Sequence, residues 1–225
     1  MIRIYSFDIS YGAHMPGGDL KKTYGFNSTI GGGFSYKTEG NWIYSVEGNY
    51  IFGRDVKIYD ELFENITTSD GYIIDEGGIY TDMAVLEAGI IANAYIGKLI
   101  PVWGPNPNSG IIIKLGGGYM YHKIRLEQTE NSAPQLSDDY IKGYDRFRQG
   151  FNFSQFIGYQ YTGNNNLANF YFGFEFNQGW SYAVRAYNFD QMAKPDKTHF
   201  DAMSGFKVGW VIPLIKDHSS DVYTY

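Results

Sequence analysis

The chain contains no cysteine, only 7 prolines in 225 residues, and no run of 18 consecutive apolar residues. Without cysteine there is no disulfide framework, no thiolate nucleophile and no cysteine-ligated metal. The missing apolar run excludes a membrane-spanning helix but not a membrane-spanning sheet. Basic residues are also scarce, with 18 Lys and Arg against 24 Asp and Glu. The net charge of −6 and the lack of a basic stripe argue against a nucleic acid as partner.

Aromatic residues are abundant instead. The chain has 21 Tyr, 16 Phe and 4 Trp, which make 18% of the residues, while charged residues make only 19%. This balance excludes a coiled coil, a collagen and a disordered acidic chain.

Apolar side chains recur at every second position in eight segments, which is the pattern of half-buried strands. On the apolar parity of these segments no residue is charged, and only Gln155 is polar. A helix would scatter the same residues around its axis. We therefore predict an all-β antiparallel meander with strands at residues 5–11, 30–37, 42–52, 86–97, 111–122, 151–161, 170–177 and 206–214.

The connections between these strands alternate in length. Residues 38–41, 97–110 and 163–166 form short or middle-length turns, whereas residues 14–29, 54–85, 125–150 and 181–204 form long loops. Because successive hairpins point to opposite ends, all long loops are expected at one end. This asymmetry is typical of outer-membrane barrels.

The volume of the apolar side chains indicates which face points outward. The apolar parity carries 21 aromatic rings, too many for the lumen of an eight-stranded barrel, which ordinary side chains already fill. A soluble, lipocalin-like barrel is the less favoured alternative. We predict one domain over residues 1–225, an eight-stranded antiparallel up-and-down transmembrane β-barrel with extracellular loops, periplasmic turns and a periplasmic tail at 215–225.

Seven charged residues fall on the inward parity of the predicted barrel. Buried charges are costly unless they are paired, so a mutually neutralising network that plugs the lumen is the favoured interpretation, and a proton or ion path is the alternative. The residues are Asp8, Lys37, Glu47, Glu87, Lys114, Glu175 and Lys207.

Two histidines are the candidates for catalysis. His122 is expected at the loop end of its strand with inward parity, near the end of the first strand that carries Asp8 and His14. A barrel enzyme acting on lipid or peptide would need such a base beside a nucleophile or a water. A hydrogen-bonding role for His14 and His122, in the interior or at the rim, is favoured over catalysis.

The long loops are half apolar, which predicts either a folded cap or a docking surface for a partner. The candidate partner-binding residues are Tyr72, Ile73, Ile74, Tyr144, Arg146, Phe147 and Arg148. Acidic clusters at residues 69–76 and 137–140, with Asp145, lack the regular ligand spacing of a calcium loop. We therefore expect solvated loops, no metal and no cofactor.

The last strand carries a pattern of polar, small and apolar residues, Lys207, Gly209, Ile212 and Leu214, that resembles the C-terminal signal read by the barrel-assembly machinery. Together with residues 13–20, the stretch 205–214 resembles the small outer-membrane β-barrel proteins of Bacteroidota. That resemblance implies a chain in the bacterial outer membrane, with its export signal removed. It also implies contacts with outer-membrane lipid and lipopolysaccharide, with the assembly machinery, and with another outer-membrane or surface protein.

The favoured function is a non-enzymatic accessory or scaffold subunit of an outer-membrane complex, acting through its extracellular loops or its lipid-facing wall. Two alternatives remain open. One is a lipid-modifying or proteolytic barrel enzyme, and the other is a small passive channel.

Overall fold

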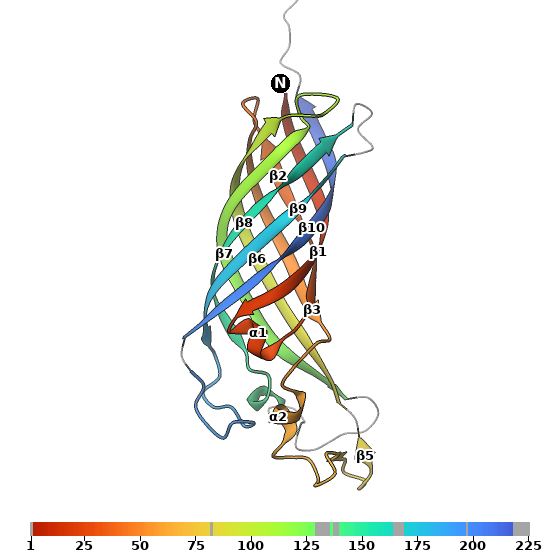
Figure 1. Ribbon diagram of the computed structural model, residues 1–225, viewed down its shortest axis with the longest axis vertical. Helices are drawn as coiled ribbons and strands as arrows, with labels where there is room; N and C mark the ends of the chain where they lie inside the picture. Colours follow the sequence, from red (N-terminus) through yellow and green to blue (C-terminus); the bar gives the residue numbers. More distant parts are fainter. Residues whose placement is uncertain are drawn as a thin grey trace, which may run out of the picture.

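The computed structural model describes residues 2–81, 83–128, 136, 140–163, 169–196 and 198–217. Its strands form a closed ring in which each pairs antiparallel with the next along the chain, and the last pairs with the first (Figure 1). This confirms the predicted eight-stranded up-and-down barrel. The strands of the ring are β1 (Arg3–Gly18), β2 (Asn27–Lys37), β3 (Trp42–Gly53), β6 (Met83–Pro101), β7 (Gly110–Gln128), β8 (Arg148–Thr162), β9 (Asn169–Ala183) and β10 (Thr198–Asp217).

The strands are longer than predicted at the end of the long loops. β1 continues to Gly18 and β10 begins at Thr198, so His14 lies within the wall and not in a loop. The alternation fades there because Ala13, Met15 and Gly17 are small or flexible residues near the rim. The loops are correspondingly shorter than the sequence pattern indicated.

The long loops also contain elements that the period-two pattern did not predict. These are the helices α1 (Leu20–Thr23) and α2 (Tyr59–Phe63), a hairpin of β4 (Ile73–Ile74) and β5 (Tyr80–Thr81), and the 3₁₀ turn η2 (Tyr140–Gly143). Figure 1 shows α1, α2 and β5 at the end of the barrel opposite the N-terminus. We call this the loop end and the opposite one the turn end.

The outer wall is apolar and the interior is polar. Phe170, Phe172, Phe174 and Phe176 are between 39% and 58% exposed, whereas Tyr171, Glu175 and Asn177, on the other parity of the same strand, are buried. An apolar exterior on a closed sheet with no free edge satisfies every backbone group inside hydrocarbon. The chain is therefore a transmembrane β-barrel. Among the described residues, no helix is long and apolar enough to cross a membrane.

Glycines on the inner face allow neighbouring strands and interior side chains to approach closely. A Cβ added to Gly118 would lie 1.9 Å from the Ala92 carbonyl oxygen, and one added to Gly209 would lie 2.3 Å from the Tyr171 ring. Since atoms cannot approach so closely, any larger residue at these positions has to move the wall or the lumen.

Two apolar clusters lie inside the molecule. The larger one, the cap core, joins the loops to the loop half of the lumen and contains Leu20, Tyr24, Ile51, Ile58, Leu62, Phe63, Ile73, Met83, Val85, Ile91, Met120, Ile124, Leu126, Leu136, Tyr144 and Met203. The smaller one lies toward the turn end and contains Ile43, Leu99, Ile112, Phe156 and Tyr171. The loops thus fold into a cap, one of the two arrangements that their apolar residues predicted.

Candidate functional site

A network of charged side chains crosses the middle of the lumen. Lys207 on β10 donates to Glu47 on β3 and to Glu175 on β9, both over 2.9 Å. Glu47 also accepts from Lys114 on β7, and His14 on β1 contacts Glu175 through Nε2 at 3.1 Å. The five residues come from five strands, so their side chains bridge the bore from several sides.

Lys114 has a second kind of partner in the lumen. Its Nζ lies 5.0 Å, 5.1 Å and 5.2 Å from the ring centroids of Tyr95, Phe156 and Tyr171. Aromatic faces attract a cation most strongly where water is excluded. The rings therefore attract the Lys114 ammonium group and also fill the space around it.

A ladder of amides extends the network across the lumen. Asn152 donates to Asn93 over 3.1 Å and to Asn177 over 3.2 Å, and Asn177 donates to Glu175 over 3.3 Å. These asparagines were not among the residues singled out from the sequence, although their position on the inward parity of the strands could have identified them. Charges and amides together form a hydrogen-bonded polar plug across the bore, in which His14 Nδ1 and Asn152 Oδ1 have no hydrogen-bond partner among the described residues.

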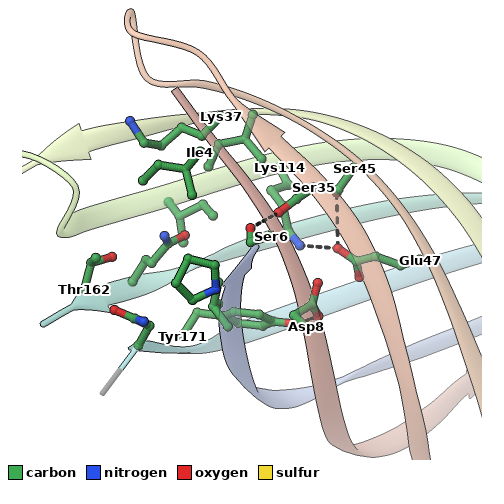
Figure 2. A pocket seen from close by; sticks show the side chains of 16 residues that line it. Ile4, Ser6, Asp8, Ser35, Lys37, Ser45, Glu47, Lys114, Thr162 and Tyr171 are labelled. Atoms are coloured by element: carbon green, nitrogen blue, oxygen red, sulfur yellow. Dashed lines mark hydrogen bonds and ion pairs between the residues drawn. The ribbon is translucent and has the colours of Figure 1, made fainter. Parts of the chain in front are cut away.

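The turn half of the lumen contains a pocket of about 40 Å³, shown in Figure 2. Asp8 lies at its inner end and accepts from the Tyr171 hydroxyl over 2.9 Å, while Lys37 donates to the Asn41 side chain over 2.8 Å. The space is enough for a few water molecules. Asp8 therefore lies in the turn half of the lumen, and the expectation that it neighbours His14 and His122 at the loop end was wrong.

His122 belongs to a second buried cluster, nearer the loop end. Its Nε2 lies 3.1 Å from Asp201, and the Ser181 hydroxyl donates to the same carboxylate oxygen. In a hydrolytic triad the histidine stands between the serine and the acid, whereas here Asp201 stands between Ser181 and His122. All three are buried, so this geometry gives no activated serine accessible to substrate.

Glu87, the remaining predicted interior charge, lies apart from the central network. Its carboxylate accepts two contacts from the Asn27 amide at 3.2 Å and 3.0 Å. Thus Glu47, Glu175, Lys114 and Lys207 are joined by ion pairs in one cluster. Asp8 and Lys37 line the turn-half pocket together with Glu47 and Lys114, whereas Glu87 is bound by Asn27.

The predicted partner-binding residues divide into buried and exposed groups. Ile73 and Tyr144 are only 2% and 5% exposed and pack in the cap core, so a partner could not reach them without opening the cap. Tyr72 and Ile74 are exposed on the β4–β5 hairpin. Successive side chains of a strand point to opposite faces, which explains why Ile73 is buried and Ile74 is exposed.

Two arginines of the loops are held by acids. Arg146 forms two hydrogen bonds to Asp190, and Arg185 donates to Asp145 over 3.0 Å and 2.5 Å. The hydrogen bond to Asp145 raises the pKa of Arg185, and burial raises the pKa of Tyr144. Phe147 lies under Arg185, with the guanidinium 5.4 Å from its ring centroid.

The acidic clusters of the loops also serve local structure. Asp75 accepts from the backbone N–H groups of Gly77 and Ile79, both over 2.8 Å. Residues 137–139 lie outside the described part of the chain, as do 218–225 of the predicted tail. Within the described ranges no group of three His, Asp or Glu side chains could hold a metal ion.

The four residues of the predicted assembly signal lie on both faces of β10. Lys207 is buried in the lumen network, and Gly209 lies beneath the Tyr171 ring. Leu214 is exposed on the outer wall and Ile212 is partly exposed. Lys207 and Gly209 are therefore required for the packing of the barrel interior, independently of any recognition by the assembly machinery.

No known family model matches the chain, and no curated protein matches it. Several solved structures are similar to it in fold, among them the following three. Ail, the attachment invasion locus protein of Yersinia pestis, is 11% identical over 93% of this chain and 100% of its own, with a TM-score of 0.41. Neisserial surface protein A is 12% identical over 92% and 95%, with a TM-score of 0.41. OprG from Pseudomonas aeruginosa is 12% identical over 93% and 95%, with a TM-score of 0.30.

Proposed function

We propose that this barrel is a non-enzymatic scaffold or accessory subunit of the bacterial outer membrane, which binds another outer-membrane or surface protein through its loop end. The loop end faces the outside of the cell and the turn end faces the periplasm. The proposal rests mainly on one feature, the β4–β5 hairpin, which projects from the loop end (Figure 1).

The hairpin presents an aromatic surface to solvent. Tyr72 and Tyr80 stack with ring centroids 4.7 Å apart, and Tyr80 and Ile79 are 60% and 61% exposed. Stacked, exposed aromatic rings are the anchors that protein interfaces favour. We call Tyr72, Ile74, Ile79 and Tyr80 the hairpin patch.

The charge around the hairpin patch indicates the kind of partner. Residues 54–82, which carry the hairpin, contain eight acidic and two basic residues, a net charge of −6. An apolar patch on an acidic loop is complementary to an apolar groove flanked by basic residues, and like-charged surfaces are rejected. The partner is therefore a protein whose contact surface carries lysines or arginines around an apolar centre.

The interior favours this function over the two alternatives. The central network and the amide ladder fill the bore, which disfavours a passive channel. The order of Ser181, Asp201 and His122, and their burial, disfavours a hydrolase. His14 is likewise buried and contacts Glu175.

The test is affinity purification of the tagged protein from its native membrane in mild detergent, followed by mass spectrometry. A companion at fixed stoichiometry should be retained by the native chain and by Tyr140→Ser, an exposed tyrosine outside the hairpin patch. The double variant Tyr72→Ser and Tyr80→Ser should lose it. A companion retained equally by all three chains, or a native chain that purifies alone, contradicts the proposal.

A further inference from the structure

Three guanidinium groups of the loop end line one small hollow. Arg146 and Arg148 come from the start of β8 and the residues just before it, and Arg185 follows β9. The hollow has a volume of about 60 Å³, and Phe147 and His199 also line it. Positive groups from separate loops therefore converge on a space of a few atoms.

Arg148 is the least neutralised of the three. Its Nη1 lies 3.5 Å from the Asp201 carboxylate, at the limit of a hydrogen bond, and that carboxylate already binds Ser181 and His122. The Arg148 side chain is only 13% exposed. Among the residues that the structure describes, the other guanidinium N–H groups of Arg148 have no hydrogen-bond acceptor. A nearly desolvated cation therefore faces the hollow with N–H donors available for a ligand.

Arg146 and Arg185 are fixed in position by their own acids. Asp190 holds Arg146 through Nε and Nη2, and Asp145 holds Arg185 in the same way. A guanidinium fixed on one edge keeps the remaining donor directed, which lowers the entropy lost when an anion binds. The hollow is thus organised before any ligand arrives.

The hollow opens into a larger cleft of about 540 Å³. The two share the lining residues Arg146, Arg148, Gln191, Asp196 and His199. The cleft adds Asp19, Lys22, Thr23, Ile58, Glu61 and Thr198, so its wall presents hydroxyl, carboxylate and amine groups beside one apolar side chain. Such a wall can accept hydrogen bonds from the hydroxyl groups of a sugar and donate hydrogen bonds to them.

We propose that this cleft binds a phosphorylated sugar, with the phosphate in the arginine hollow against Arg148 and the sugar ring in the larger cleft. Guanidinium groups bind phosphate through paired, charge-assisted hydrogen bonds. The exposed Glu61 carboxylate accepts from sugar hydroxyls in the cleft, and Asp196, which lines both the hollow and the cleft, accepts from a hydroxyl group next to the phosphate. The same chemistry occurs in the phosphorylated sugars of lipopolysaccharide and in free sugar phosphates, and this inference does not depend on a protein partner.

The experiment measures binding to the full chain in detergent micelles by calorimetry, with glucose 6-phosphate, glucose and inorganic phosphate as probes. Glucose 6-phosphate should bind saturably and at least about tenfold more tightly than either of the others. Arg148→Gln should weaken its binding about tenfold to a hundredfold, the range for hydrogen bonds to charged groups. Arg125→Gln is the matched control, because Arg125 is exposed at the loop end and does not line the cleft.

Arg148→Lys is a second variant for the case that Arg148→Gln does not fold, because the lysine keeps a positive charge beside Asp201. It should bind glucose 6-phosphate more weakly than the native chain, since an ammonium lacks the planar fork. Competition with purified lipopolysaccharide, intact or stripped of phosphate, identifies the source. Displacement by the intact form alone assigns the ligand to the membrane, and displacement by neither assigns it to free sugar phosphates.

Three results would overturn the proposal. The first is absence of saturable binding by both glucose 6-phosphate and intact lipopolysaccharide. The second is equal affinity for the native chain and the folded Arg148 variants. The third is displacement of glucose 6-phosphate by stripped lipopolysaccharide as strong as by the intact form, since the phosphate would then contribute nothing.

Discussion

Replacing Lys207 with methionine tests whether the central network stabilises the barrel. Lys207 is 1% exposed and holds Glu47 and Glu175 at 2.9 Å each. In Lys207→Met the two carboxylates stay buried, Glu47 with Lys114 and Glu175 with His14. Removing one member of a buried ion pair costs about 3–5 kcal/mol, so we expect a loss of about 4 kcal/mol.

Reversible unfolding in guanidinium chloride, followed by tryptophan fluorescence in detergent micelles, measures this loss. With a slope of about 4 kcal/mol/M, the unfolding midpoint should fall by about 1 M. Lys98→Met is the control, because Lys98 is at the surface of the turn end and donates to the Gly40 carbonyl. Its midpoint should stay within about 0.2 M of the native value, as surface substitutions change stability by about 0.5 kcal/mol.

A second substitution separates charge from packing. If unpaired charge causes the loss, adding Glu175→Gln to Lys207→Met should recover part of it, because one buried carboxylate is removed. If lost volume causes the loss, the double variant should be no more stable than the single one. A Lys207→Met chain as stable as the native one would refute the reasoning altogether.

Three further predictions concern the wall, the membrane and the rim. Gly118→Ala should destabilise the barrel by about 1–3 kcal/mol, because its Cβ would meet a carbonyl oxygen at 1.9 Å, whereas Gly48→Ala, with nothing within 4 Å, should be neutral in the same unfolding assay. Phe174→Arg should cost about 2–4 kcal/mol in lipid vesicles, as measured by urea unfolding, and an unchanged midpoint would contradict a lipid-facing Phe174. The hydrogen bond from Lys22 and the Phe200 N–H hold the pKa of Asp19 below its usual range, so the stability from these contacts is present above about pH 4 and lost as the pH falls further. Amide exchange of residues 20–25, corrected for the intrinsic rate, should therefore rise below pH 4 in the native chain, and an equal rise in Asp19→Asn would contradict this role.

The sequence predicted the barrel well because a lipid-facing wall imposes one rule on every second residue. The rule assigns Phe170 and Lys207 to opposite faces without any knowledge of their neighbours. It does not state which inward charges meet, since that depends on strand register and on the reach of each side chain. Lys207 and Glu47 are 160 residues apart and meet only after closure, whereas Asp8, of the same parity, contacts Tyr171 instead.

The loops were harder to predict because residues only a few positions apart face either water or the cap core, and no regular period along the sequence distinguishes the two. Ile73 and Ile74 have nearly the same chemistry, yet one is buried and the other is exposed. The arginine hollow illustrates the same difficulty. Arg148 was recognisable as an interface residue, but Asp190, Asp145 and Arg185, which shape the hollow, come from three separate positions that only the folded loops bring together.

The cap core has a consequence for how the molecule responds to temperature. Its loop residues, such as Leu62 and Phe63, are buried away from water, whereas the side chains of the outer wall exchange contacts with hydrocarbon. The water-driven attraction that holds the cap weakens on cooling, and attraction between the wall and lipid does not share this dependence. Chilling should therefore loosen the loops first while the sheet stays closed, so the two halves of one chain differ in their sensitivity to cold.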